Sequence, residues 1–175
     1  MRPRVGVVFP GSPRDPSTWS GTPAGLCAGL EEAGVEVVPL NAAPGPALDF
    51  LTKNLVAGLR IRQARRGSVH ETLRLARAMA RASPELTTVR TAVLGRRLKH
   101  VGQLDGLVQI GAGYVAGTDA PIAVFEDITV PQAVALGYPE WRVLSAKAVR
   151  ARIDLQREVY ERARACCLTS HWAAR

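Results

Sequence analysis

The chain has 175 residues, of which 47% are hydrophobic and 22% are charged. This composition is typical of one globular domain and excludes a disordered chain. A net charge of +8 raises the question of an anionic partner. Because no apolar run approaches the length of a membrane span, and residues 1–4 lead directly into an apolar segment without a signal peptide, the sequence predicts a cytoplasmic protein.

The chain begins with an alternation of strand and helix. Residues Val5 to Pro10 predict a buried strand, and Ala24 to Ala33 predict a helix that stops at Gly34. A second strand is expected over Val35 to Leu40. Two strands joined by a helix form a βαβ unit, which is parallel and right-handed.

The next predicted segment is helical, from Pro46 to about His100, and is interrupted at Gly67-Ser68 and Ser83-Pro84. The serine in each break is a candidate cap for the helix that follows. Apolar residues recur at helical spacing on two stripes: Leu51, Leu55 and Leu59 on the first, and Val69, Leu73, Ala76 and Ala80 on the second.

Many arginines fall between Arg60 and Arg97 in this helical region. Two interpretations remain open for them: a solvated helix face, or contact with an anionic partner such as a membrane surface, a phosphorylated substrate or nucleic acid. Aromatic residues are only 5% of the chain and are not interleaved with the arginines, so nucleic acid is the least favoured of these partners.

Strand character returns over Leu104 to Ile110 and over Pro121 to Glu126. Only ten residues, 111–120, separate these two strands, which is short for a parallel crossover. After Pro131 we expect one short helix and then a long one from about Arg142 to Arg164. A stripe along this long helix is expected to comprise Val149, Ile153, Gln156, Tyr160 and Ala163.

The last predicted strand covers Cys166 to Thr169, and Ser170 is expected to cap a further helix. Because a bridge between adjacent cysteines would be strained, we interpret Cys166 and Cys167 as reduced core thiols. The three histidines show no spacing typical of a zinc site, so no metal and no cofactor is expected.

Together these elements predict an α/β fold, a Rossmann-like, mostly parallel sheet with helices on both faces, in one domain over residues 1–175. Ligands bind such sheets at the carboxyl ends of the strands. The segments expected at that edge are 11–22, 111–119, 126–130 and 170–171.

The named phosphate motifs are not matched at this edge. The loop over residues 11–22 has no lysine and is not a P-loop, and the glycines of residues 111–117 do not have the spacing of the dinucleotide fingerprint. Ser20, Gly21 and Thr22 at a helix start have two interpretations. Their backbone can approach a phosphate, or Ser20 or Thr22 merely caps the helix that has Pro23 at its first position.

Two adjacent carboxylates, Glu126 and Asp127, follow a predicted buried strand. Like charges so close repel each other unless one faces solvent, a cation or a ligand donor. Asp127 can simply cap the turn before Pro131. Alternatively, Glu126 or Asp127 faces sugar hydroxyls or a developing positive charge.

Three segments taken together resemble the N-terminal domain of the GT-B glycosyltransferases of family four: "DPSTWSGTP" (15–23), "VFEDIT" (124–129) and "SHWAAR" (170–175), with Glu158 in the helix before the last. The resemblance covers nearly the whole chain. It implies a Rossmann-like half that faces a second, C-terminal domain across a cleft. The second domain, absent from this chain, would hold most of the nucleotide-sugar donor, and the domain described here would bind a sugar or lipid-linked acceptor.

The resemblance also implies site residues. Gly21, with Ser20 beside it, matches the glycine that approaches the donor diphosphate, and Asp127 matches the acidic position at the strand end. Glu126 stands where many members have histidine, and Ser170 matches the serine that opens the last helix. We therefore predict catalytic roles for Asp127 and Glu126, and substrate binding by Trp19, Ser20, Gly21, Thr22, Gly111 and Ser170.

The implied function is retaining transfer of a sugar, with residues 1–175 alone expected to be inactive. Such a protein would be cytoplasmic, with an anionic surface at the inner face of the membrane as a candidate partner. Two alternatives remain: a non-catalytic module that binds sugars or anions, and another doubly wound enzyme that modifies nucleotide sugars.

Overall fold

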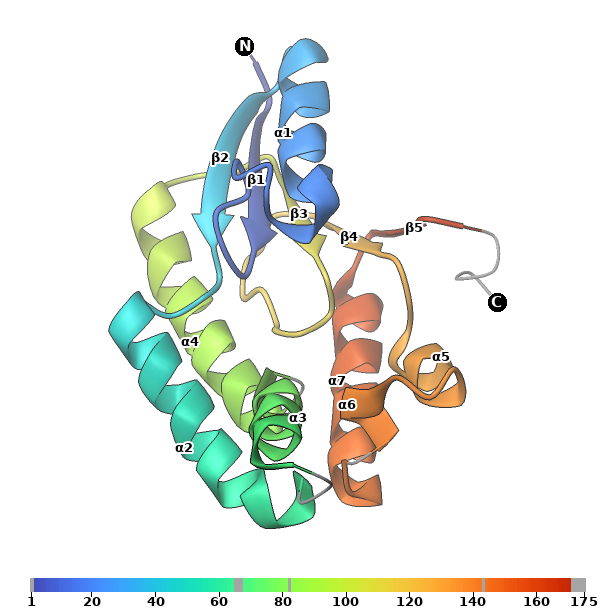
Figure 1. The fold of residues 1–175 in the computed structure, drawn as a ribbon. Helices are drawn as coiled ribbons and strands as arrows, with labels where there is room; N and C mark the ends of the chain where they lie inside the picture. Colours follow the sequence, from blue (N-terminus) through green and yellow to red (C-terminus); the bar gives the residue numbers. More distant parts are fainter. Residues whose placement is uncertain (1, 65–67, 82, 143, 171–175) are drawn as a thin grey trace.

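Figure 1 shows the fold in a computed structural model that describes residues 2–64, 68–81, 83–142 and 144–170. The strands are β1 (Arg4–Phe9), β2 (Glu36–Asn41), β3 (Gly106–Ile110), β4 (Ile122–Glu126) and β5 (Ala165–Leu168). The helices are η1 (Trp19–Gly21), α1 (Thr22–Glu32), α2 (Pro46–Ala64), α3 (Val69–Arg81), α4 (Pro84–Val101), α5 (Val130–Ala135), α6 (Pro139–Arg142) and α7 (Ala146–Arg162).

The five strands form one sheet in the order β2-β1-β3-β4-β5, and every neighbouring pair is parallel. The predicted α/β class and parallel sheet are therefore confirmed. The predicted strands and the first helix agree with the structure to within two residues at each end. Gly34, with a φ of +83°, follows α1 as expected of a residue just past a helix end.

Successive residues of β1 face opposite sides of the sheet, so the strand contributes to two cores. Val7 packs with Cys27 of α1 in one core, and Val8 packs with Leu94 of α4 and Val159 of α7 in the other. Helices thus cover both faces, as predicted, and the carboxyl ends of β1, β3 and β4 lie together at one edge (Figure 1).

The connection between β3 and β4 runs without a helix, although the strands are parallel. The connection can be short because the loop itself fills the space that a crossover helix would occupy. Ala112, Tyr114 and Ala116 are buried in the core shared by α4 and α7. The Gln109 amide nitrogen donates to the carbonyl oxygens of Gly111 (3.1 Å) and Tyr114 (2.8 Å), which satisfies buried backbone groups inside the loop.

The long predicted helical region is three helices, α2, α3 and α4, and the break at Ser83-Pro84 is confirmed. At the other predicted break, Ser68 precedes α3 as expected, and Gly67 lies outside the described residues. Ser83 caps α4 by accepting from the Leu86 N–H (3.4 Å), and Ser68 accepts from the Glu71 N–H (3.2 Å). Helices α2 and α3 pack on each other below the sheet (Figure 1), where Val56 of α2 and Met79 of α3 are buried in a separate cluster. The leucine stripe of α2 is not part of this cluster.

The C-terminal third differs from the prediction in three details. A further short helix, α6, precedes α7, which begins at Ala146 with Ser145 as its cap. The buried face of α7 is Ala148, Arg152, Gln156 and Val159, so of the predicted stripe only Gln156 is fully buried. Cys166 and Cys167 are free but exposed, because β5 is an edge strand, and the interpretation as core thiols is wrong. The helix expected after Ser170 lies outside the described residues.

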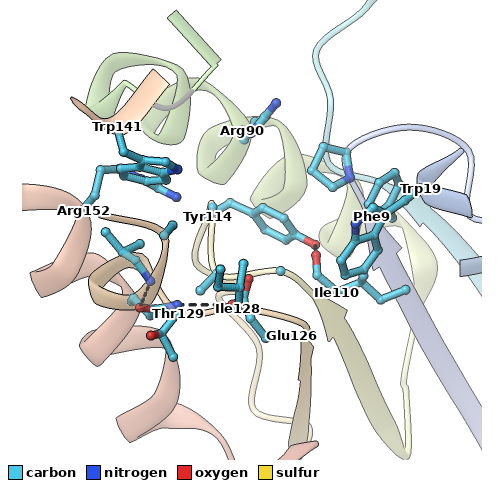
Figure 2. Close-up of a pocket in the computed structure, with 17 residues that line it drawn as sticks. Phe9, Trp19, Arg90, Ile110, Tyr114, Glu126, Ile128, Thr129, Trp141 and Arg152 are labelled. Carbon is cyan, nitrogen blue, oxygen red and sulfur yellow. Dashed lines mark hydrogen bonds between the residues drawn. The ribbon is translucent and has the colours of Figure 1, made fainter. Parts of the chain in front are cut away.

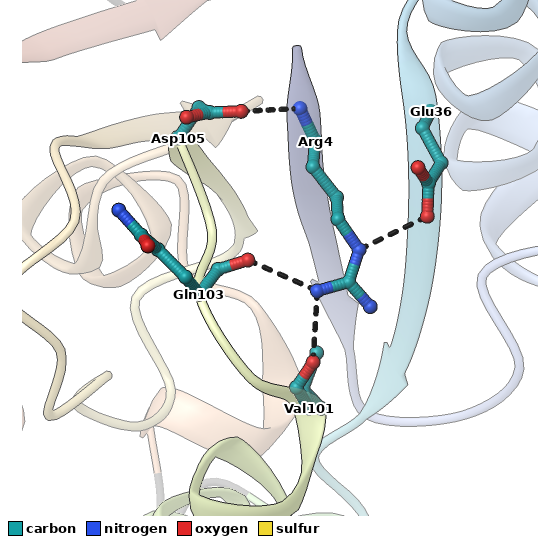
Figure 3. A network of polar contacts seen from close by, with 5 residues as sticks. All are labelled: Arg4, Glu36, Val101, Gln103 and Asp105. Atoms are coloured by element: carbon teal, nitrogen blue, oxygen red, sulfur yellow. Dashed lines mark hydrogen bonds and ion pairs between the residues drawn. The ribbon is translucent and has the colours of Figure 1, made fainter. Parts of the chain in front are cut away.

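At the amino edge of the sheet, Arg4 joins three segments (Figure 3). Its backbone N–H donates to the Asp105 carboxylate (2.7 Å), and its Nε donates to the Glu36 carboxylate (2.9 Å). Its Nη1 donates to the carbonyl oxygens of Val101 (2.9 Å) and Gln103 (3.0 Å). This arginine ties β1 to β2 and to the turn between α4 and β3, and so stabilises the order of the central strands.

Candidate functional site

A cavity of about 410 Å³ opens at the carboxyl edge of the sheet, where β1, β3 and β4 end (Figure 2). Its walls come from segments far apart in sequence: the ends of those strands, the loop before α1, and helices α4, α5, α6 and α7. This volume lies at the lower end of the range for small-molecule sites. The position is the one at which parallel α/β sheets bind ligands.

One wall of the cavity is aromatic. Trp19 stacks on Phe9, with ring centroids 5.9 Å apart, and meets the edge of Phe125 at 6.3 Å. The backbone that holds Trp19 is unusual, because Trp19 (φ 45°) and Ser20 (φ 56°) both adopt the left-handed region ahead of Gly21 (φ 78°). Left-handed non-glycine residues are strained, and such strain persists only where the surroundings impose it. The long loop thus holds the Trp19 ring in the wall of the cavity.

The floor is built around Tyr114, which is fully buried. Its hydroxyl lies 2.9 Å from the carbonyl oxygens of both Val8 and Ile110, at the ends of β1 and β3. A phenol has one proton to donate, so the two carbonyls share it. Tyr114 therefore closes the bottom of the cavity and braces two strand ends.

Glu126, the last residue of β4, is partly buried and faces the cavity. Its Oε2 accepts from the Gln156 amide and the Tyr160 hydroxyl, both at 3.5 Å. Burial, with a smaller contribution from Asp127, raises the pKa of Glu126 to about 7, against the opposing effects of the Gln156 hydrogen bond and of Arg152. A carboxyl with this pKa can accept a hydrogen bond from a hydroxyl when ionised and donate one when protonated.

Gln156 of α7 bonds both to Glu126 and to the segment that follows β4. Its Oε1 accepts from the Val130 N–H (2.9 Å) at the start of α5, and its Nε2 also donates to the Tyr160 hydroxyl (3.1 Å). Thr129 caps α5 in a capping box with Gln132. These bonds fix the segment after β4, and with it the direction of the Glu126 side chain.

Two arginines supply positive charge to the cavity: Arg152 lies beside Trp141, across from Trp19, and Arg90 stands on α4 between the two sides (Figure 2). Arg152 of α7 is only 8% exposed; its Nη1 donates to the Thr87 hydroxyl (2.9 Å), and its Cζ lies 5.9 Å from the centre of the Trp141 ring. Arg90 of α4 is partly buried. Burial lowers the pKa of both guanidinium groups, that of Arg152 to about 10, and both remain cations at neutral pH.

The structure brings three of the predicted site residues together. Trp19, Gly111 and Glu126 all line the cavity. Gly111 has a φ of +82°, and its N–H donates to the Phe125 carbonyl (2.8 Å), so it turns the chain between β3 and the loop below the cavity.

The other predicted site residues lie outside the lining of this cavity. Ser20 and Ser170 are exposed, and Gly21 and Thr22 are partly exposed at the start of α1. Asp127 is exposed, with its backbone carbonyl 3.5 Å from the Thr169 hydroxyl. Of the two neighbouring carboxylates, Glu126 is therefore the one that faces the cavity.

The structure also decides whether Ser20, Thr22 and Asp127 act as helix caps. The N-cap of α1 is Gly21, with no capping side chain, so neither Ser20 nor Thr22 caps this helix. Pro23 lies in its first turn, as predicted. Thr129, and not Asp127, provides the cap before Pro131. Capping therefore does not explain these residues, and their predicted roles in binding and catalysis stay predictions.

The arginines between Arg60 and Arg97 have different roles. Arg74, Arg77 and Arg96 are exposed, as a solvated face requires. Arg97 donates to the carbonyl oxygens of Asn41 and Ala43 (3.1 Å) after β2, which is a structural role. Arg90 turns into the cavity. The side chains of five further arginines lie outside the described part of the structure: Arg60, Arg62, Arg65, Arg66 and Arg81.

Sequence reasoning missed Arg90, Arg152, Tyr114 and Trp141 as site residues. A signal was available for Arg152, because it shares a helical stripe with Ala148, Gln156 and Val159, where a buried cation is unexpected. Arg90 had no such signal, since one arginine among many on a basic helix does not stand out.

Across the described residues, no helix has the length and apolar character of a membrane span, and no three His, Cys, Asp or Glu side chains are grouped to hold a metal. Comparisons of this chain with known protein families, with curated proteins and with solved structures found no match.

Proposed function

We propose that this chain is the acceptor-side domain of a retaining glycosyltransferase, in which a sugar moves from a nucleotide-sugar donor to an acceptor held in the carboxyl-edge cavity. The observation that carries the proposal is the placement of Glu126. A carboxyl with a pKa of about 7 lies in a small cavity that has an aromatic wall at Trp19. Sugars present hydroxyls to such carboxyls and flat apolar faces to aromatic rings.

The proposed role of Glu126 is to bind an acceptor hydroxyl and orient it for attack. Asp127, exposed at the rim, is proposed to contact the donor, because solvent-facing groups at this edge would face a second domain. Ser20, Gly21 and Thr22, with Ser170, lie near the start of α1 and after β5, and are proposed to meet the donor diphosphate. The donor domain itself lies outside this chain in this proposal.

The test uses the longest natural form of the protein, incubated with a panel of nucleotide sugars and sugar acceptors, with product analysed for anomeric configuration. Transfer with retention supports the proposal. Saturable binding of sugars with neither transfer nor change of the donor would instead identify a non-catalytic sugar- or anion-binding module. Conversion of the nucleotide sugar without any acceptor would identify a nucleotide-sugar-modifying enzyme.

A membrane surface is proposed as a second partner because of the leucine stripe on α2. Leu51, Leu55 and Leu59 are 63%, 69% and 71% exposed. The neighbouring helix α3 carries two exposed arginines, Arg74 and Arg77. A helix with an apolar face beside basic side chains is typical of proteins that lie on anionic bilayers.

A further inference from the structure

The guanidinium groups of Arg90 and Arg152 converge on one glycine. Gly113, in the loop between β3 and β4, has no side chain, and the point where a Cβ would stand is 3.5 Å from Arg90 Nη1 and 3.7 Å from Arg152 Nη2. The two cations come from different helices, α4 and α7, so only the folded chain brings them together. A bare backbone thus leaves space between two positive groups at the wall of the cavity.

Both guanidinium groups carry unused hydrogen-bond donors. The Nε atoms of Arg90 and of Arg152 are buried and have no hydrogen-bond partner among the described residues. Arg152 is also more than nine-tenths buried, although its Nη1 bonds to Thr87. Buried donors are almost always paired, so each orphan requires an explanation. A ligand in the cavity would bind the Nη atoms beside Gly113, and the unpaired Nε atoms show that the protein alone does not fully compensate these two guanidinium groups.

The charges around the pair do not balance. Arg90 and Arg152 repel each other, which lowers the pKa of Arg152 in addition to the effect of burial. Glu126 is the acid that opposes Arg152, and burial keeps this carboxyl partly protonated near neutral pH, with its pKa raised to about 7. Asp49 of α2 opposes Arg90, but this carboxylate is also paired with the Lys53 cation. Asp127 is exposed to solvent. An excess of positive charge therefore remains in a cavity with an aromatic wall.

We propose that Arg90 and Arg152 bind the phosphate of a small phosphorylated sugar, which occupies the cavity with its phosphate over Gly113. The planar fork of arginine matches phosphate oxygens, and the double negative charge of a phosphate monoester balances two guanidinium groups. The sugar ring then extends towards Glu126 and Trp19. This inference deepens the proposed function, on which it rests for the role of the ligand: the acceptor is a sugar phosphate.

Calorimetric titration of the 175-residue chain tests the inference, with glucose 6-phosphate as the probe and glucose at equal ionic strength as the comparison. We expect saturable binding of glucose 6-phosphate that is at least about tenfold tighter than that of glucose. Inorganic phosphate should compete for the same site. Glucuronate separates phosphate from carboxylate, and binding of glucuronate as tight as that of glucose 6-phosphate would overturn the assignment to phosphate.

Matched variants locate the site. Arg90→Gln and Arg152→Gln should each weaken glucose 6-phosphate binding about tenfold or more, since each loses charged hydrogen bonds. The controls are Arg96→Gln and Arg150→Gln, which remove exposed charges from the same two helices and should change the affinity less than about twofold. Equal weakening by all four variants would show a general charge effect and overturn the inference.

Gly113→Ala keeps the test decisive if an arginine variant fails to fold. The added methyl group would meet the two guanidinium groups at ordinary contact distances, so the fold should persist with both charges in place. The methyl group would nevertheless occupy the space proposed for the phosphate, and we expect binding to weaken about tenfold. Unchanged affinity in Gly113→Ala would overturn the inference.

These measurements also separate the inference from the proposed function. Tight binding of glucose 6-phosphate by a protein whose full natural form transfers no sugar would retain the phosphate site and reject the glycosyltransferase. Transfer to a neutral sugar, without any preference for its phosphorylated form, would retain the glycosyltransferase and reject the phosphate site.

Discussion

The two edges of the sheet use arginine in opposite ways. At the amino edge, the backbone N–H, Nε and Nη1 of Arg4 all bond to protein oxygens, on β2 and on the turn before β3. At the carboxyl edge, Arg90 and Arg152 are more deeply placed but keep buried nitrogens without a partner among the described residues. At the amino edge the arginine is therefore paired within the protein and stabilises the strand order. The carboxyl edge instead holds positive charge that the protein alone does not neutralise.

This contrast distinguishes structural arginines from ligand-binding ones. An arginine that organises the fold is bonded to carbonyl and carboxylate oxygens of the chain, as Arg4 and Arg97 are. An arginine kept for a ligand lowers stability until the ligand arrives, because its charge is desolvated without full compensation. Substitutions at the two edges should therefore affect activity and stability differently.

The largest expected effect is on catalysis at the carboxyl edge. Under the proposed function, Glu126→Gln in the longest natural form of the protein should lower kcat/KM about 100-fold, or about 2.7 kcal/mol, because a neutral amide carries no negative charge and has no proton to exchange. Asp127→Asn is the matched neighbour and should lower turnover about tenfold through the donor. A Glu126→Gln enzyme with full turnover per folded molecule would contradict the role assigned to Glu126.

The raised pKa of Glu126 also predicts that the free energy of unfolding depends on pH. Because the folded-state pKa of Glu126 is about 7, above that of an unfolded chain, the folded state holds this proton more tightly. The stability that this group contributes is fully present below the unfolded pKa and is lost as pH rises through about 7, by about 3 kcal/mol. The groups facing the carboxyl are Asp127, Arg152, Gln156 and Tyr160.

Urea unfolding at about pH 5 and about pH 8 measures this effect. The free energy of unfolding of the natural chain should fall more between the two pH values than that of Glu126→Gln, which has no proton to lose. Parallel pH dependence in the two proteins would mean that the Glu126 carboxyl titrates normally. Asp127→Asn serves as the control, since its side chain is exposed and should leave most of the difference in place.

Removing arginines from the two edges should give opposite results for stability. Arg4→Gln loses an ion pair and two bonds to carbonyl oxygens, so we expect the free energy of unfolding to fall by about 1.5 kcal/mol, with the partial exposure of Arg4 limiting the loss. Arg90→Met removes a desolvated cation whose Nε has no partner among the described residues and which lies beside Arg152, and should leave stability unchanged or raise it. A larger loss from Arg90→Met than from Arg4→Gln would contradict the contrast between the edges.

The smallest effect on stability is expected on α2. Leu55→Ser changes a side chain that is already 69% exposed, so the free energy of unfolding should change by less than about 0.5 kcal/mol. Binding to vesicles that contain anionic lipid should nevertheless weaken, and the binding of the natural chain should fall as salt rises. Equal binding of the natural chain to neutral and acidic vesicles would leave the leucine stripe without a membrane role.

Much of the fold followed from local patterns in the sequence. The apolar run before Pro10, the glycine after α1 and the serines before α3 and α4 act over a few residues, so their effect can be read without knowing the rest of the chain. The parallel order of the strands followed from the alternation of strand and helix. The carboxyl edge as the site of the cavity followed from that order.

Sequence patterns misjudged features that depend on which surface a residue meets. The predicted stripe of α2 had helical spacing, yet Leu51, Leu55 and Leu59 point away from the core while Val56 and Ala57 are buried. On α7 the buried face is turned by one residue from the predicted stripe, which places Arg152 inside. Helical periodicity gives an apolar arc, but only the packed neighbours decide which part of that arc is covered.

Local sequence was enough to establish the α/β class, the parallel sheet and the presence of Trp19, Gly111 and Glu126 at the carboxyl edge. It took the packing of the whole chain to turn Glu126 and not Asp127 into the cavity, and to bring Arg90 and Arg152 together over Gly113. The physical reason is distance along the chain. The two arginines and the glycine belong to α4, α7 and a loop, and no local propensity links side chains that become neighbours only when those helices pack on the sheet.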